Sequence, residues 1–190
     1  MKILVTGAMG LLGKEVAQLC KSQGDLVVAT DIASEDNPLD ITSLPAIRGF
    51  LASCGPDWLI NCAAYTDVDG CEKNRDIAYE LNARGPGNLA RACEEYGSKL
   101  LHISTDYVFD GENPKPYEED DAPNPVNVYG KSKRAGEISV QEGVENYIIV
   151  RTQWLFGPYG KNFVSTILGI AQQQDAISVV NDQWGSPTYA

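Results

Sequence analysis

The chain has 190 residues, enough to bury a sizeable core, and one domain is the default expectation. Fifteen Lys and Arg against 26 Asp and Glu give a net charge of −11, which argues against a nucleic-acid partner. No apolar stretch approaches the roughly 20 residues of a membrane span, and the N-terminus lacks a signal-peptide pattern, so no membrane association is expected. The five cysteines include no Cys-x-x-Cys pair, which predicts free thiols in a reducing cytoplasm and neither disulfides nor a metal site.

The first stretch, residues 2–13 (KILVTGAMGLLG), predicts a strand, a glycine turn and a helix. The apolar run at residues 3–5 suits one buried strand, and the apolar residues that follow the turn recur at helical spacing. Gly7, Gly10 and Gly13 lie three residues apart. Glycine permits a sharp turn and close approach of the backbone to a ligand, and the N–H groups that begin the helix favour a pyrophosphate.

An acidic residue follows the next apolar run, residues 26–29. Asp31 lies roughly 20 residues beyond the glycines, where a dinucleotide-binding fold places a carboxylate on the adenosine ribose. The whole pattern therefore predicts dinucleotide binding; the alternative is an ordinary helix N-terminus with a solvated aspartate. Asp31 is followed by Ile32 and by no arginine, which favours an unphosphorylated ribose and hence NADH, although basic residues from elsewhere could still accept NADPH.

The rest of the chain alternates helical and strand patterns. Further strands are expected at residues 58–64, 100–103, 147–151 and 177–180. One helix is expected at residues 12–23, where Leu12, Val16, Leu19, Cys20 and Gln23 lie near one face. Further helices are expected at about 43–53, 71–82, 85–96, 128–141 and 162–174, with a polar surface loop at 110–127. Such alternation predicts a Rossmann-type doubly wound α/β fold with a parallel sheet, whose ligands bind beyond the carboxyl ends of the strands.

A second candidate site lies on the predicted helix at 128–141. Tyr129 and Lys133 are four residues apart and share one helix face. A neighbouring ammonium favours phenolate and lowers the phenol pKa, which suits the pair to proton transfer. An isolated pair of this kind usually marks an exposed helix face, but Thr105 follows a predicted strand, and hydroxyl, phenol and ammonium beside a nicotinamide would form a carbonyl-reduction site. His102, the only histidine, is expected to be packed in the fold rather than catalytic.

These motifs resemble those of the extended short-chain dehydrogenase/reductases. Five stretches more narrowly resemble the dTDP-4-dehydrorhamnose reductase family: residues 61–69 (NCAAYTDVD), 104–111 (STDYVFDG), 127–133 (NVYGKSK), 151–154 (RTQW) and 181–188 (NDQWGSPT). The resemblance covers essentially the whole chain. It implies that NADH or NADPH reduces the C4 ketone of dTDP-4-dehydro-L-rhamnose, giving dTDP-L-rhamnose for cell-surface polysaccharide.

The resemblance also implies a role for each matching residue. The catalytic set is Thr105, Tyr129 and Lys133. The cofactor-binding set is Gly7, Met9, Gly10, Leu11, Gly13, Asp31, Ile32, Asp40, Ile41, Ala63, Ala64, Tyr65, Tyr129 and Lys133. The substrate-binding set is Thr66, Val68, Thr105, Asp106, Tyr107 and Trp154. Simpler explanations stay open for three of these, because Val68 and Trp154 could be core residues and Asp106 could cap a turn.

Family members usually continue for roughly another 90 residues. We therefore expect residues 1–150 to form the dinucleotide-binding domain, and residues 151–190 to be the start of a substrate-binding part whose C-terminal subdomain is largely missing. The resemblance further implies a homodimer, with contacts partly in that missing part.

Two alternative functions remain open. The first is another NDP-sugar epimerase or reductase, which the reductase pattern at residues 104–109 disfavours. The second is a non-catalytic, cofactor-binding regulatory subunit similar to the methionine adenosyltransferase β subunit, which resembles the same family. The intact Tyr129 and Lys133 argue only mildly against the second alternative.

Overall fold

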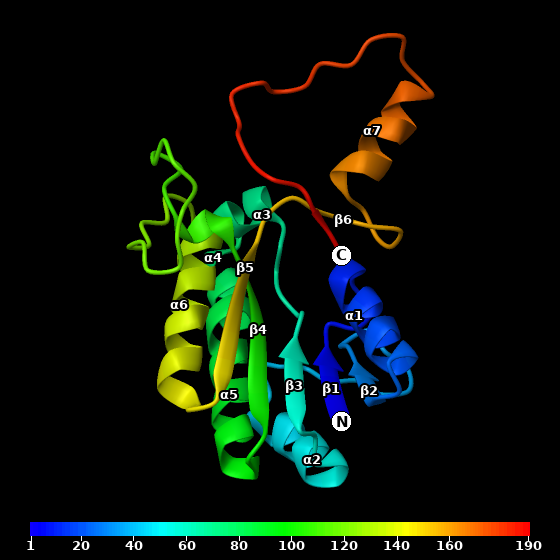
Figure 1. Cartoon of the computed structure of the whole chain (residues 1–190), viewed down its shortest axis with the longest axis vertical. Coiled ribbons are helices and arrows are strands. Elements are labelled where there is room, and N and C mark those ends of the chain that lie inside the picture. The colour runs from blue at the N-terminus through cyan, green and yellow to red at the C-terminus, as the bar shows by residue number, and fades with distance from the viewer.

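A computed structural model describes all 190 residues as a parallel sheet with helices on both faces (Figure 1). The sheet has five parallel strands in the order β2 (Leu26–Thr30), β1 (Lys2–Thr6), β3 (Trp58–Asn61), β4 (Lys99–Thr105) and β5 (Tyr147–Thr152). The predicted doubly wound α/β fold is confirmed. The strand order changes direction between β1 and β3, and in such sheets the carboxyl ends of the strands at this position form the ligand crevice.

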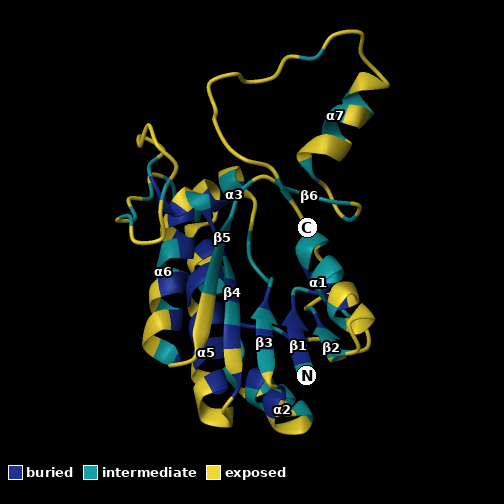
Figure 2. Ribbon diagram, in the orientation of Figure 1, coloured by how far each residue is buried: buried dark blue, intermediate teal, exposed yellow.

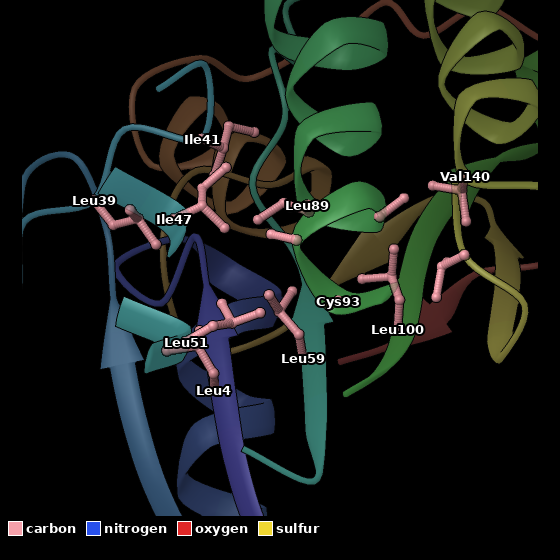
Figure 3. Packing of buried hydrophobic residues seen from close by; sticks show 13 residues of the cluster. Leu4, Leu39, Ile41, Ile47, Leu51, Leu59, Leu89, Cys93, Leu100 and Val140 are labelled. Carbon is pink, nitrogen blue, oxygen red and sulfur yellow. The ribbon is translucent and has the colours of Figure 1, made fainter. Parts of the chain in front are cut away.

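The middle residues of β1 and β3 are apolar, as is typical of strands with both faces buried. Leu4 of β1 belongs to the large core beneath α2 (Leu44–Cys54), α5 (Gly85–Tyr96) and α6 (Val128–Gly143). Ile3 and Val5, its neighbours in β1, point to the other face and pack with α1 (Leu11–Ser22). Figures 2 and 3 show this burial and the larger of the two clusters.

The inner face of α1 differs in detail from the prediction. Gly13 and Ala17 are its buried residues, whereas Leu19 is 61% exposed. Small residues occupy the buried stripe because α1 packs close to the turn and the sheet, and a leucine side chain is accommodated only on the outer surface.

The segment between β3 and α5 is more broken than the single helix predicted for residues 71–82. It consists of α3 (Val68–Lys73), α4 (Arg75–Tyr79) and a π-helical turn, η1 (Glu80–Arg84), that runs directly into α5. The α-helical periodicity of 3.6 residues does not reveal a π-helical turn, because the i→i+5 hydrogen bonds of that turn place an additional residue in it.

The residues after β5, 153–190, leave the main sheet (Figure 1). They form a two-stranded parallel pair, β6 (Leu155–Phe156) with β7 (Thr188–Tyr189), and the helix α7 (Phe163–Ala171), which buries none of its residues. The strand predicted at residues 177–180 is wrong. Val179 and Val180 are exposed and have no neighbouring strand, and an apolar run without a pairing partner does not form a strand.

None of the helices combines the length and apolarity needed to cross a bilayer.

We predict that Leu59→Ala lowers the free energy of unfolding by about 3 kcal/mol, because Leu59 is fully buried in the larger core and its truncation leaves a cavity. Leu19→Ala is the matched control and should change the free energy of unfolding by less than about 0.5 kcal/mol, since Leu19 is a surface residue. Urea unfolding followed by circular dichroism measures both. Equal effects of the two substitutions would contradict the assigned core.

Candidate active site

The glycine turn after β1 touches the backbone that follows β3. Gly7 has a φ of +71°, and a Cβ added to it would lie 2.5 Å from the amide nitrogen of Ala63. A Cβ on Gly13 would overlap the carbonyl oxygen of Gly7, so α1 packs directly on the turn. Any side chain at Gly7 would push the two strand ends apart. The glycines thus bring together the start of α1 and the carboxyl ends of β1 and β3.

A hollow of about 200 Å³ opens at this position. Its lining contains Gly7, Gly10, Asp31, Ile32, Asp40, Ile41, Ala63 and Ala64 from the predicted cofactor set, together with Leu39, Cys62 and Leu81. Sequence reasoning missed the last three. Leu39 and Cys62 adjoin predicted residues and extend the same two segments, but Leu81 comes from η1 and no sequence signal pointed to it.

Asp31 is bound to the glycine turn. Its carboxylate accepts hydrogen bonds from the amides of Met9 and Ala33, each at 3.0 Å. This contact differs from the alternative of a solvated aspartate, because the Oδ2 atom of Asp31 is hydrogen bonded to the Met9 amide and joins the glycine turn to the end of β2. Leu11, the first residue of α1, lies instead against the later turn at Gly160, where an added Cβ would be 3.5 Å from the Leu11 Cβ.

The second group of predicted residues gathers at the end of β4. Thr105 caps the short 3₁₀ turn η2 (Asp106–Val108): its hydroxyl donates to Asp106 Oδ1 at 3.0 Å and accepts from the Tyr107 amide at 3.2 Å. The ring of Tyr107 meets that of Tyr129 edge to face, with centroids 5.5 Å apart. Tyr129 lies in the first turn of α6, which begins there because the Asn127 side chain caps the helix by accepting from the Gly130 amide.

Lys133, one turn further along α6, is buried. Its Nζ donates to the carbonyl oxygen of Ile103 in β4 at 2.7 Å. Burial lowers the pKa of Lys133 to about 8, against the attraction of Glu137. Since β3 and β4 are neighbouring parallel strands, Cys62, which follows β3 and lines the hollow, lies at the same edge of the sheet as the cluster at the end of β4.

The prediction that the ammonium lowers the pKa of Tyr129 is wrong for this structure. Burial raises the pKa of Tyr129 to about 12, and interaction with the Thr105 hydroxyl opposes this only in part. The physical reason is that Lys133 directs its Nζ to the Ile103 carbonyl, while Asp106 adds negative charge near the phenol. Tyr129 is therefore protonated at neutral pH and can donate a hydrogen bond.

Asn82 is a positioning residue that sequence reasoning missed. From η1 its side chain accepts from the Tyr65 amide at 2.8 Å and donates to the Tyr65 carbonyl at 2.9 Å and to Ser132 Oγ at 3.0 Å. It therefore ties the loop after β3, including Tyr65 of the predicted cofactor set, to α6.

The middle of the sheet carries a buried polar row. Asn61 accepts from the Thr6 hydroxyl at 2.7 Å, and its amide nitrogen lies 2.9 Å from His102 Nδ1. His102 is fully buried, which confirms that it is packed in the fold, and burial holds its pKa well below its usual value, so it is neutral.

The remaining predicted substrate residues are more open. Thr66 is exposed, and Val68 is half-buried at the start of α3. Trp154 has a φ of +49° and is 45% exposed, which excludes its being a core residue. An added Cβ on Gly185 would lie 3.0 Å from the Trp154 ring, so the stretch before β7 passes over Trp154.

The parallel sheet, its strand-order reversal and the glycine turn define a Rossmann-type α/β protein with a polar cluster beside its ligand crevice. The family model described as RmlD substrate binding domain matches residues 1–190, and the chain belongs to this family.

Individual relatives agree. A dTDP-4-dehydrorhamnose reductase of Aggregatibacter actinomycetemcomitans is 43% identical over 189 residues, which are 100% of this chain and 63% of that protein. A crystal structure of a dTDP-4-dehydrorhamnose reductase from Clostridium acetobutylicum has a TM-score of 0.94 at 46% identity, covering 100% of this chain and 66% of that one. A crystal structure of the dTDP-4-dehydrorhamnose reductase from Bacillus anthracis, in complex with NADP, has a TM-score of 0.94 at 45% identity. The match covers 99% of this chain and 66% of that one. The chain thus spans about two thirds of these relatives.

We predict that Lys133→Met raises the free energy of unfolding at pH 7 by about 1–2 kcal/mol, because the buried ammonium is penalised in the folded state. The pKa of Lys133 is about 8 in the folded protein and 10.5 in the unfolded chain, so between pH 8 and 10.5 the unfolded chain binds more protons. The free-energy penalty of the buried ammonium therefore disappears as the pH rises through this range. The advantage of the variant should therefore shrink between pH 8 and 10.5. Lys131→Met, on the exposed side of α6, should show neither effect in urea unfolding. A gain that does not depend on pH would contradict the explanation.

Proposed function

We propose that this chain is the cofactor-binding and catalytic part of an NAD(P)H-dependent reductase. Its substrate would be the C4 ketone of dTDP-4-dehydro-L-rhamnose, and its product dTDP-L-rhamnose for cell-surface polysaccharide. The observation that supports this proposal most directly is that Thr105, Tyr129 and Lys133 are grouped at the carboxyl end of β4, beside the hollow at the glycine turn. The names of the relatives favour this function over a non-catalytic regulatory subunit.

The cofactor assignment rests on the glycine turn, where a side chain at Gly7 or Gly13 would overlap neighbouring backbone atoms. Gly7 leaves no room for a Cβ, and the first amides of α1 favour a pyrophosphate beside it. In this proposal Gly7, Gly10 and Gly13 border the pyrophosphate, Asp31 and Ile32 the adenosine ribose, Asp40 and Ile41 the adenine, and Ala63, Ala64 and Tyr65 the middle of the cofactor. Met9 and Leu11 complete the cofactor-binding set. Lys133 and Tyr129 contact the nicotinamide ribose.

The chemistry assigned to the chain is orientation of the ketone and delivery of a proton. The nicotinamide, when bound, supplies the hydride. Thr105 orients the carbonyl by hydrogen bonding, and Tyr129 gives its proton to the carbonyl oxygen. A phenol with a pKa of about 12 holds that proton at neutral pH, and its interaction with the Thr105 hydroxyl favours the phenolate left behind.

The sugar side of the site is assigned to residues around the end of β4. They are Thr66, Val68, Asp106, Tyr107 and Trp154, with Thr105 shared. We assign residues 1–150 to dinucleotide binding and residues 151–190 to the start of the substrate-binding part, in keeping with the departure of the chain from the main sheet after Thr152. A homodimer and a cytoplasmic location belong to the same proposal.

We predict that Tyr129→Phe lowers turnover of dTDP-4-dehydrorhamnose by about 10²–10⁴-fold while cofactor affinity stays nearly unchanged, because only the donated proton is removed. Turnover is followed by the loss of reduced-nicotinamide absorbance, and affinity by fluorescence titration. Tyr96→Phe, at the exposed end of α5, is the control and should behave as wild type. Full activity in Tyr129→Phe would refute the assigned donor, whereas cofactor binding without any wild-type turnover would favour the regulatory subunit.

We predict that Asp31→Ala weakens NADH binding by about tenfold, the equivalent of one lost hydrogen bond to a charged group, and weakens NADPH binding less. The carboxylate accepts from a free ribose hydroxyl but repels a 2′-phosphate, so its removal has compensating effects for NADPH. Asp76→Ala, an exposed acid on α4, controls for the loss of one negative charge. Equal losses of affinity for the two cofactors would remove the ribose role of Asp31.

A further inference from the structure

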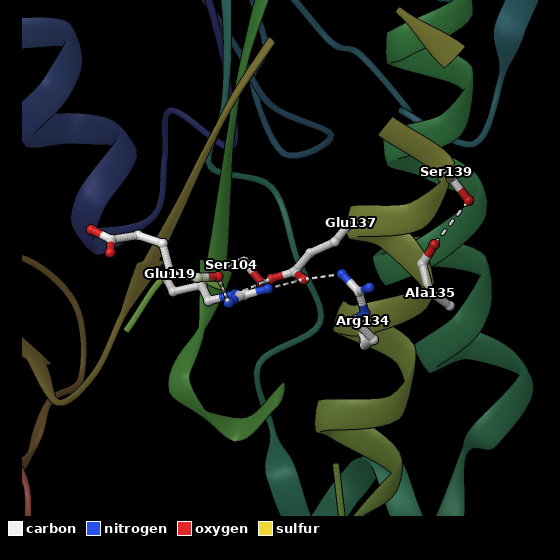
Figure 4. A network of polar contacts seen from close by, with 7 residues as sticks. Ser104, Glu119, Arg134, Ala135, Glu137 and Ser139 are labelled. Atoms are coloured by element: carbon white, nitrogen blue, oxygen red, sulfur yellow. Dashed lines mark hydrogen bonds and ion pairs between the residues drawn. The ribbon is translucent and has the colours of Figure 1, made fainter. Parts of the chain in front are cut away.

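A buried ion network lies directly behind the Tyr129–Lys133 pair. It is centred on Glu137, which is one turn beyond Lys133 on α6 and has a fully buried side chain (Figure 4). Neither the sequence motifs nor the proposed mechanism uses this carboxylate.

Four donors surround Glu137. Arg151 of β5 binds it through Nε and Nη2, both at 2.9 Å, and Arg134 binds it through Nη1 at 2.8 Å. The Ser104 hydroxyl donates to its Oε1 at 2.6 Å. Burial works to raise the pKa of Glu137, but these hydrogen bonds outweigh it and the pKa is lowered, so Glu137 is a carboxylate.

The contact with Ser104 matters because of what adjoins it in β4. Ser104 lies between Ile103, whose carbonyl accepts from Lys133, and Thr105, the proposed orienting hydroxyl. Two residues one turn apart on α6 therefore hold two successive residues of β4. This double contact sets the position of Thr105 relative to the first turn of α6, where Tyr129 lies.

Glu137 is also the one anionic group that acts on Lys133 from its own helix. The other titratable groups that face Lys133 are Cys62 after β3 and His102 in β4. Burial raises the pKa of Cys62 to about 12 and holds the pKa of His102 well below its usual value, so both are neutral at pH 7. Attraction to Glu137 raises the pKa of Lys133 against the effect of burial.

We propose that Glu137 is a positioning residue of the reductase site, which holds the end of β4 against α6 and sets the electrostatic environment of Lys133 one helical turn away. This inference rests on the proposed function. Fold stability alone is a poor reason for such a network, because well-packed apolar residues usually stabilise a core as much as a buried ion pair does.

The test is Glu137→Gln, which keeps the size and an acceptor for Ser104 but removes the charge. With side-chain-labelled lysine, NMR titration gives the Lys133 midpoint directly, and Lys133→Met assigns the signal. The midpoint should fall by about one pH unit, and the basic limb of the turnover–pH profile should move down by the same amount. Turnover at pH 9 would then fall about tenfold, with much less change at pH 6. An unmoved midpoint and profile would overturn the proposal.

Two variants separate charge from structure. Glu137→Asp keeps the charge and should return the Lys133 midpoint toward the wild-type value, whereas Glu95→Gln, the same change in the exposed pair with Arg48, should move nothing. If Glu137→Gln does not fold, Arg151→Gln tests the opposite sign: it removes a cation from the carboxylate, and the midpoint of Lys133 should rise. A midpoint that stays in place in Arg151→Gln would also overturn the proposal.

The titration needs no substrate, so the two proposals fail separately. The expected midpoint shift in a protein without turnover would overturn the reductase and retain the electrostatic role of Glu137. Turnover with an unmoved Lys133 midpoint and an unmoved pH profile would retain the reductase proposal and overturn the electrostatic role of Glu137.

Discussion

The contact between the glycine turn and the backbone after β3 is the constraint on which the site depends. Gly7 and Ala63 approach so closely that a single Cβ would separate them, and Gly13 allows α1 to pack on the same turn. The N-terminal amides of α1, the carboxylate of Asp31 and the small residues after β3 therefore surround one hollow. The sheet supplies the rigid support, because β1 and β3 are buried on both faces.

The polar cluster beyond β4 is positioned by α6 rather than by a loop. Tyr129, Lys133 and Glu137 are spaced by four residues on one helix, and the last two are hydrogen bonded to successive residues of β4. A rigid helix face gives more precise placement than a loop does, which suits the proton transfer proposed for Tyr129. Asn82 in η1 adds a tie from α6 to the loop after β3 through Ser132 and Tyr65.

This arrangement has a cost in stability. Lys133 is fully buried in a place where its charge is disfavoured, and Tyr129 is kept protonated by burial. Such strained groups gather at functional sites, where stability and activity compete. Attraction to the buried Glu137 offsets part of the burial penalty on the ammonium, whereas the two arginines bound to Glu137 act in the opposite direction.

The sequence alone determined the parallel α/β fold, the glycine turn, Asp31 and the Tyr129–Lys133 spacing, because these depend on local periodicity and on residue types with narrow backbone preferences. Tertiary structure decided the rest. The turn η1, the roles of Asn82 and Glu137, and the direction of the Lys133 side chain depend on contacts between segments 30 to 50 residues apart. The pKa of Tyr129 moved opposite to the local expectation, because burial by the fold raises it while Lys133 directs its Nζ to the Ile103 carbonyl.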